Sequence, residues 1–306
     1  MIKVEGLTKL YGDRAAINNL NFEVNKGEVV GFLGPNGAGK TTTMKILTGF
    51  MAPTSGLVTI GGVDIFEDPI LAKSKIGYLP EKPPLYMDMK VEKYLAFVAG
   101  LRGVEKDSMT SSVDKALECL DLKEVRGRVI GNLSKGFRQR VGIAQAIVSN
   151  PEVLILDEPT VGLDPSQVAH FRELLKELKG KHTIIVSTHI LPEVQASCER
   201  VVIINEGHIV AQDSLKSLSQ KTTGGVRRVK IKVQRVKDQF SKVLEDLEFV
   251  KMSSFAGQHL HVDLSGGDES LEELSSRVVE SGMGLIGMEV STEKLEDIFL
   301  ELTSKS

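Results

Sequence analysis

The chain has 306 residues, of which 41% are hydrophobic and 26% are charged, and its formal net charge at pH 7 is −3. This balance is ordinary for a soluble globular protein and argues against a basic nucleic-acid-binding surface, so no nucleic-acid partner is expected. No segment reaches the ~18 consecutive apolar residues of a membrane-spanning helix, and residues 1–5 lack the apolar core of a signal peptide. We therefore expect a cytoplasmic protein with one large and one small domain, whose attachment to a membrane would need a partner.

The first 33 residues read as strands separated by tight turns, with strands expected at 2–5, 20–24 and 28–33. Tyr11 lies in the first turn, next to Gly12. Its ring would stack on a purine base, or it would simply be a half-exposed turn tyrosine. Position alone leaves both interpretations open.

A glycine-rich segment follows the third strand and fits the spacing of a phosphate-binding loop, with a helix expected after it. Phosphate binding needs this order, because glycines let backbone N–H groups approach the phosphates and the helix N-terminus adds partial positive charge. Lys40 would reach the β- and γ-phosphates, and the Thr41 hydroxyl would ligate Mg²⁺. A plain glycine-rich turn is the disfavoured alternative. The residues expected to bind nucleotide here are Gly34, Pro35, Asn36, Gly37, Ala38, Gly39, Lys40, Thr41 and Thr42.

A helical segment then interrupts the strand-rich pattern. Residues 76–81 read as a strand that ends at Glu81, and apolar residues recur with helical spacing from 91 to 122. The segment from about 82 to 149 is therefore interpreted as an inserted helical subdomain.

The last helix of this subdomain is expected to begin near Ser134 and to run to about residue 149. Ser134 suits the N-cap, where its oxygen accepts an orphan backbone N–H, and this structural role explains it by itself. Lys135 and Arg138 beside the helix N-terminus would also make a favourable anion site.

Residues 153–156 form a continuous apolar run that predicts a strand buried on both faces, and Asp157 and Glu158 follow it directly. Two adjacent carboxylates are costly to bury unless they hold a cation or move a proton, and ligands bind at this end of an open parallel sheet. Asp157 would hold Mg²⁺, and Glu158 would polarise the attacking water. The alternative is an ordinary acidic junction between strand and loop.

Two further polar residues follow. Asp164 suits a helix N-cap, with Pro165 at the first helical position, so local structure explains both. A buried strand at 183–188 ends at His189, which would lie at the same sheet edge as Asp157 and could hydrogen-bond a γ-phosphate.

The composition changes after the large domain, which is expected to span 1–215. Residues 216–225 are polar and end in two glycines, so a linker is expected there. Residues 226–306 form the predicted accessory domain, with the order β-α-β-β-α-β and a final helix near 292–302.

The motifs together resemble the nucleotide-binding ATPase subunit of ABC transporters over residues 1 to about 215. The matching features are the phosphate loop, the loop with Glu81, the 133–140 signature, the acidic strand, Asp164 and His189. The resemblance implies an α/β fold: the P-loop NTPase core of an ABC ATPase, with a mixed sheet, flanking helices and an inserted helical subdomain, then a small α+β ferredoxin-like domain. The tail at 295–302 looks like the C-terminal domain of many ABC-2-type exporter ATPases, and the signature looks most like the gliding-motility-associated branch.

The resemblance also implies roles for individual residues. ATP and Mg²⁺ would be the ligands, Tyr11 would stack on adenine, and His189 would sense the γ-phosphate. Ser134 and Gly136 would bind the γ-phosphate of ATP held by a second ATPase subunit, with a homodimer expected, and Asp164 would lie at that interface. Closure of two subunits, hydrolysis at Glu158 and reopening would then drive transport.

An integral-membrane permease is the implied partner, which would hold the chain peripherally at the inner face of the cell membrane. Residues 85–89 are a candidate docking surface for it, and the core of the helical subdomain is the equal alternative. A soluble ABC ATPase acting on ribosomes or DNA is the competing function. Those relatives usually carry two ATPase units or a long coiled coil, and this chain has one unit and no sustained heptads.

Three residues depart from the usual pattern of the family. Glu81 stands where many relatives have glutamine, so it would accept from a Mg²⁺-bound water but could not donate. Lys135 replaces a usual glycine and Phe137 a usual glutamine. These departures leave ATP binding as predicted and bear on the rate of hydrolysis and the strength of the dimer.

Overall fold

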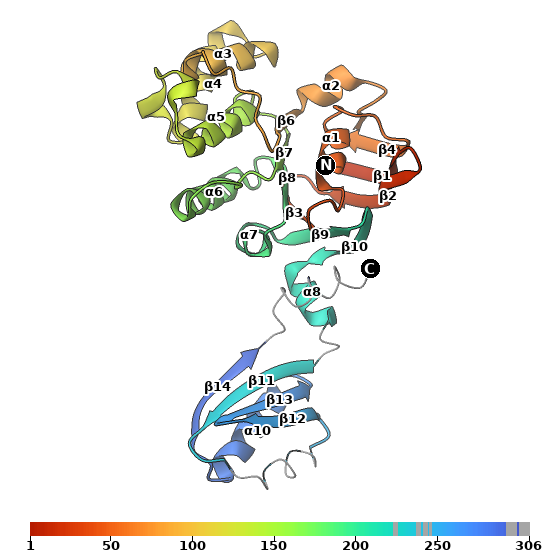
Figure 1. The fold of residues 1–306 in the computed structure, drawn as a ribbon, viewed down its shortest axis with the longest axis vertical. Coiled ribbons are helices and arrows are strands. Elements are labelled where there is room, and N and C mark those ends of the chain that lie inside the picture. Colours follow the sequence, from red (N-terminus) through yellow and green to blue (C-terminus); the bar gives the residue numbers. More distant parts are fainter. Residues whose placement is uncertain (223–225, 237–239, 241–243, 245–246, 292–298, 300–306) are drawn as a thin grey trace. The chain divides into compact units, whose positions relative to one another are not determined.

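The computed structural model describes residues 1–222, 226–236, 240, 244, 247–291 and 299 (Figure 1). The chain divides into two compact units, one over Met1–Asp213 and one over Ser214–Lys305. In the part of the chain that the structure describes, no helix is long and apolar enough to cross a membrane.

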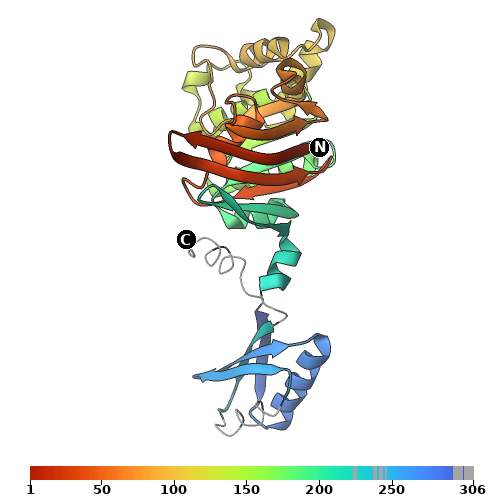
Figure 2. The ribbon, with the colours of Figure 1, turned by 90° about the vertical axis from the view of Figure 1, so that its right-hand side faces the viewer.

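An antiparallel sheet forms one layer of the first unit, and its two long strands face the viewer in Figure 2. Its long strands extend well beyond the predicted segments. Register shifts in the pairing of β1 with β2, next to Gly6 (φ 60°) and Asn19 (φ 50°), let pairing continue past irregular positions. The strands, in the order in which they pair, are β2 (Arg14–Val24), β1 (Ile2–Tyr11), β4 (Ser55–Ile60) and β5 (Val63–Asp64).

A six-stranded sheet forms the central layer. Three of its strands are buried at every position, as expected for a parallel sheet that is covered on both faces. Parallel pairing joins β9 to β3, β3 to β8, β8 to β7 and β7 to β6. The strands in spatial order are β10 (His208–Ser214), β9 (Arg200–Asn205), β3 (Val29–Leu33), β8 (Thr183–Thr188), β7 (Val153–Asp157) and β6 (Ile76–Leu79).

Helix α1 (Lys40–Leu47) lies between the two sheets, whereas α6 (Pro165–Leu178) and α7 (Leu191–Ser197) lie on the other face of the central sheet (Figure 1). Met44 and Leu47 of α1 are fully buried. The core between the sheets includes the rings of Phe22 and Phe32, whose centroids are 5.5 Å apart. The carboxyl ends of the parallel strands and the start of α1 therefore meet at one edge of this core.

The inserted segment is helical, as predicted. Helices α3 and α4 contact each other, and α5 contacts both of them and β6. The elements after β5 are α2 (Pro69–Ser74), which precedes β6, then α3 (Val91–Leu101), α4 (Lys106–Cys119), the 3-10 turns η1 (Lys123–Val125) and η2 (Ile130–Asn132), and α5 (Lys135–Ile147).

The second unit has its own core. Its antiparallel sheet has the order β12-β13-β11-β14, which is the arrangement of a split β-α-β fold. Phe240 and Leu244, in the segment between β11 and β12, are buried in the same core. The described elements are α8 (Leu215–Thr222), β11 (Val226–Val233), β12 (Val250–Ala256), β13 (His259–Ser265), α10 (Asp268–Glu280) and β14 (Leu285–Ser291).

Two segments of this half of the chain were expected to have other or further structure. Residues 215–222, which overlap most of the predicted linker at 216–225, form helix α8. Leu218 on this helix is buried, a packing contact that the polar composition of the segment does not reveal. The predicted final helix at 292–302 lies outside the described residues except at Phe299.

Candidate active site

The glycine-rich loop connects β3 to α1 through a turn that has no room for side chains at two positions. Gly39 is the N-cap of α1 and has φ 109°. A Cβ at Gly39 would lie 2.6 Å from Ile17 Cγ2, and a Cβ at Gly34 would overlap the Ile204 carbonyl. The backbone can therefore pass close to its neighbours and direct the first N–H groups of α1 toward the loop.

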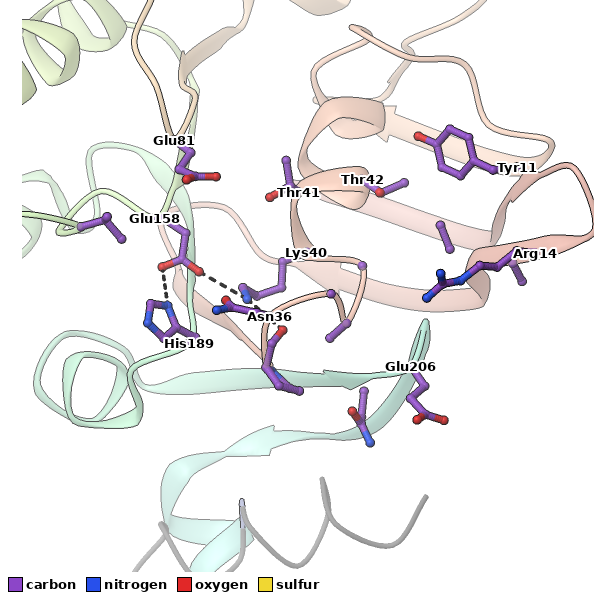
Figure 3. A pocket seen from close by; sticks show the side chains of 18 residues that line it. Tyr11, Arg14, Asn36, Lys40, Thr41, Thr42, Glu81, Glu158, His189 and Glu206 are labelled. Atoms are coloured by element: carbon purple, nitrogen blue, oxygen red, sulfur yellow. Dashed lines mark hydrogen bonds and ion pairs between the residues drawn. The ribbon is translucent and has the colours of Figure 1, made fainter.

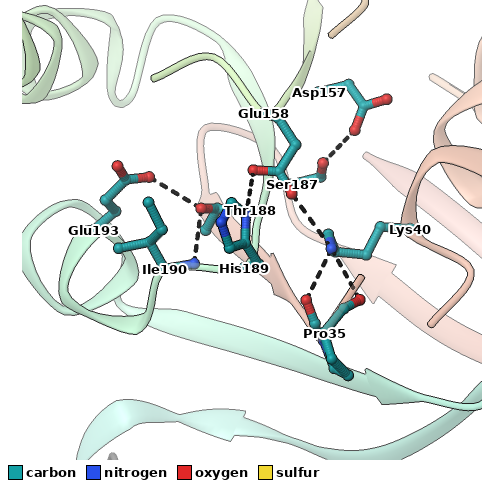
Figure 4. A network of polar contacts seen from close by, with 10 residues as sticks. Pro35, Lys40, Asp157, Glu158, Ser187, Thr188, His189, Ile190 and Glu193 are labelled. Atoms are coloured by element: carbon teal, nitrogen blue, oxygen red, sulfur yellow. Dashed lines mark hydrogen bonds and ion pairs between the residues drawn. The ribbon is translucent and has the colours of Figure 1, made fainter. Parts of the chain in front are cut away.

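Lys40, the first residue of α1, is held inside this loop. Its ammonium group donates to the carbonyl oxygens of Gly34 at 2.8 Å and Pro35 at 3.1 Å, and it lies 3.3 Å from Glu158 Oε1 (Figure 4). Only 6% of the residue is exposed. A buried ammonium group needs several oxygen partners to offset the loss of water. Charged phosphate oxygens would bind it more strongly than the neutral carbonyl oxygens do.

Glu158 reaches the loop from the end of β7 through an unusual backbone conformation. Its φ of 48° lies in the left-handed region, which costs free energy for a residue other than glycine. Its N–H donates to the Ser187 carbonyl at 3.0 Å, and its carboxylate lies between Lys40 and His189, whose Nδ1 is 2.9 Å from Oε2. The structure thus brings together the three predicted catalytic side chains (Figure 3).

Asp157 lies one residue earlier and is fully buried. The Ser187 hydroxyl donates to its Oδ1, whereas its buried Oδ2 has no hydrogen-bond partner within the part of the chain that the structure describes. Burial raises the pKa of Asp157, nearby Glu158 and Glu81 raise it further, and the Ser187 and Thr41 hydroxyls oppose the rise. A hard cation that prefers carboxylate and hydroxyl oxygens would satisfy Oδ2 and offset this cost, so Asp157, Thr41 and Glu81 fit a Mg²⁺ ion.

A cleft of about 1130 Å³ opens over these groups and is large enough for a nucleotide. Tyr11 stands at its other end with half of its surface exposed, and its hydroxyl donates to Met51 Sδ at 3.0 Å. The Lys9 ammonium lies 5.6 Å from the centroid of the Tyr11 ring. The predicted site residues that line the cleft are Tyr11, Pro35, Asn36, Gly37, Ala38, Gly39, Lys40, Thr41, Thr42, Glu81, Glu158 and His189.

The structure also places residues in the cleft that the sequence analysis missed. Arg14, on β2, lies at the same end as Tyr11, and Glu206 lies in the turn after β9 (Figure 3). Neither residue belongs to a recognisable motif. The only signal for Arg14 is its position, three residues after the candidate stacking ring.

Five predicted residues are not among those that line the cleft. Gly34 and Asp157 lie in the phosphate loop and at the end of β7, next to residues that do line it, whereas Ser134, Gly136 and Asp164 lie on other elements. Ser134 is the N-cap of α5 and accepts from the Phe137 N–H at 3.3 Å, and Gly136 lies buried in the same first turn. Asp164 caps α6 by accepting from the Gln167 N–H at 2.9 Å, and hydrogen bonds, first that of the Ser166 hydroxyl, lower its pKa. Ser134 and Asp164 have the N-cap roles that their positions predict, and the roles of Ser134, Gly136 and Asp164 at a second subunit stay predictions.

Comparison with known proteins identifies the family to which this chain is similar. A family model described as "ABC transporter" matches residues 17–161. The uncharacterized ABC transporter ATP-binding protein YxlF of Bacillus subtilis is 33% identical over 306 residues, which cover 99% of each chain. The bacitracin transport ATP-binding protein BcrA of Bacillus licheniformis is 34% identical over 307 residues, which cover 99% of this chain and 97% of that protein.

Solved structures match part of the chain. One, described as the ATP-binding subunit of an ABC transporter, is 31% identical with a TM-score of 0.68, covering 73% of this chain and 93% of that one. The dimeric post-hydrolysis structure of the ATP-binding cassette MJ0796, bound to ADP and Pi, is 26% identical with a TM-score of 0.64. The match covers 70% of this chain and 99% of that one. The chain therefore belongs to the ABC transporter ATP-binding proteins and is an ATP-binding, ATP-hydrolysing subunit of a transporter.

Proposed function

We propose that this subunit powers an ABC-2-type exporter, in which two ATPase subunits close around ATP and pull on a membrane permease. The observation that carries the proposal is the length of the matches. Relatives described as bacitracin transport and linearmycin resistance ATP-binding proteins match 97–99% of their own length, including the second unit. Solved cassettes match only 70–73% of this chain. The narrower assignment to the gliding-motility-associated branch rests on the signature segment alone.

The geometry supports hydrolysis by direct attack of water on the γ-phosphate. A new bond forms from the water oxygen to phosphorus as the bond to the ADP oxygen breaks, and Glu158 orients the water and accepts its proton. Lys40 exchanges carbonyl oxygens for phosphate oxygens, and His189 holds the Glu158 carboxylate. Mg²⁺ bound by Thr41 and Asp157, with Glu81 acting through water, would neutralise phosphate charge.

A second copy of the chain would complete the site. Ser134 and Asp164 are exposed and lie outside the cleft of their own chain, which supports contact with nucleotide held by a neighbour. The dimeric structure of the relative MJ0796 supports the same arrangement by analogy. We propose a homodimer because one chain contains every element of both halves of such a site.

We also propose where the permease docks. Apolar side chains stay exposed along α2, α3 and the segment 85–89, with Ile70 84% and Leu101 72% exposed. Tyr86 packs on Phe97 with ring centroids 5.6 Å apart and is itself half exposed, so the segment is not simply core. Large exposed apolar patches mark interaction sites, and a permease docked here would hold the subunit at the inner face of the cell membrane.

Recovery of the complex from native membranes tests the proposal. A tagged chain should co-purify with a multi-span protein in stoichiometric amount after solubilisation, and Leu101→Lys should reduce that recovery. Leu57→Lys is the matched control, because Leu57 is an exposed leucine on the antiparallel sheet. Recovery only with ribosomes or nucleic acid would favour a soluble ABC ATPase and would leave the ATPase chemistry in place.

A further inference from the structure

The first turns of α5 contact the loop that follows Glu158. Gln139, which is only 7% exposed, donates from Nε2 to the Pro159 carbonyl at 2.8 Å. The Lys135 side chain lies so close to Gly162 that a Cβ there would overlap its ammonium group. Helix α5 therefore contacts the loop between Glu158 and Asp164 at Pro159 and at Gly162.

This contact falls next to the strained residue of the site. Glu158 keeps its left-handed conformation with help from Ser187 on the β8 side, whose carbonyl accepts the Glu158 N–H. On the α5 side, the residue after Glu158 is Pro159. Because proline has no N–H, its carbonyl is the only backbone group through which a hydrogen bond can fix Pro159. Gln139 occupies that carbonyl. One hydrogen bond thus fixes the Glu158 N–H and the other fixes the Pro159 carbonyl, so the backbone is held on both sides of the Glu158 side chain.

We propose that Gln139 is a positioning residue for ATP hydrolysis. Its hydrogen bond to Pro159 fixes the backbone that directs the Glu158 carboxylate toward Lys40 and the γ-phosphate. The inference rests on the proposed function, which assigns Glu158 as the group that activates water. Small displacements of such a group reduce the rate strongly, because only the productive geometry stabilises the transition state.

The position of Gln139 has a consequence for the dimer. It lies five residues after Ser134 on the same rigid helix. A phosphate of the neighbouring copy that displaced the start of α5 would also displace Pro159. The occupancy of one site and the geometry of Glu158 in the other would then be coupled through this hydrogen bond.

Removal of the Gln139 donor tests the inference in the purified full chain. Gln139→Met keeps the length of the side chain and loses the N–H, and kcat should decrease about tenfold, which corresponds to roughly 1.4 kcal/mol. The KM and the dissociation constant for ATP should stay within about twofold, because Gln139 does not line the cleft. Gln139→Glu, which replaces the donor with an acceptor of the same size, should show the same loss.

Gln145→Met is the matched control. Gln145 lies on the same helix and accepts a hydrogen bond from the Tyr94 hydroxyl inside the helical subdomain. This variant should lower the melting temperature to a similar extent while kcat stays normal. A normal kcat in either folded Gln139 variant, or an equal loss of kcat in Gln145→Met, would overturn the inference.

Glu158→Gln separates the two proposals. If this variant loses hydrolysis while Gln139→Met keeps it, the positioning role fails and the proposed function stands. If Glu158→Gln itself keeps hydrolysis, the assignment of Glu158 fails, and the positioning role that depends on it is overturned with it.

Discussion

The Lys40 ammonium and the Glu158 carboxylate form an ion pair of 3.3 Å in which neither side chain is more than 8% exposed. Lys40 comes from the phosphate loop and Glu158 from the end of β7, so the pair joins the group that binds phosphate to the group that would activate water. Both charges are expensive to bury alone, and each keeps a second partner when the other is removed. This arrangement allows the two roles to be separated by mutation.

We expect Glu158→Gln to bind ATP and to lose nearly all turnover. Glutamine keeps the shape of the side chain but cannot accept the proton of the attacking water, and the loss of a general base lowers kcat by about 10²–10⁴-fold. Lys40 retains the Gly34 and Pro35 carbonyls, so the phosphate loop should stay intact. Phosphate release and equilibrium ATP binding, measured on the same preparation, check this outcome. Unchanged hydrolysis would refute Glu158 as the base.

We expect Ser134→Arg to block hydrolysis without weakening the binding of ATP to the monomer. Ser134 is outside the cleft of its own chain, so a large cation there would disturb only a site shared with a second copy. The lost N-cap should lower stability by about 1 kcal/mol. Ser111→Arg, at an exposed position on α4, is the control for charge and size. Full activity of Ser134→Arg would remove the proposed role across the dimer.

Without Mg²⁺ and nucleotide, we expect the stability of the protein to depend on pH through Asp157. Because burial holds the folded-state pKa of Asp157 above the ordinary value of 3.8, folding disfavours its charged form. The resulting cost in folding free energy is absent below pH 3.8, grows as the pH rises from 3.8 to the folded-state pKa, and is constant above it. Without Mg²⁺ and nucleotide, Asp157→Asn should therefore melt at a higher temperature than the wild type near neutral pH, and the difference should shrink toward pH 3.8.

Melting curves across this pH range check the prediction, with Asp13→Asn in the exposed turn after β1 as the control. Adding Mg²⁺ should raise the melting temperature of the wild type more than that of Asp157→Asn, because the cation offsets the buried charge. A variant that is less stable than the wild type at neutral pH and equally responsive to Mg²⁺ would contradict the assignment.

The sequence predicted the elements whose signals are local. The phosphate loop, the buried strand before Asp157 and the caps at Ser134 and Asp164 all depend on residues that are neighbours in the chain. Elements held by distant contacts were harder to predict. Helix α7 has only seven residues and buries Leu191 and Val194 where it packs on β3 and β8, and α8 lies in a polar segment in which Leu218 is buried.

The sequence by itself determined that this chain contains a phosphate loop and an acidic strand end, because spacing and residue type suffice for both. Only the tertiary structure decided that Lys40, Glu158 and His189 meet, since three separate segments converge at one edge of the parallel sheet. It also decided the contact of Gln139 with Pro159, which joins residues 20 positions apart. Contacts of this kind depend on how helices pack on a sheet, and no local pattern of residues encodes them.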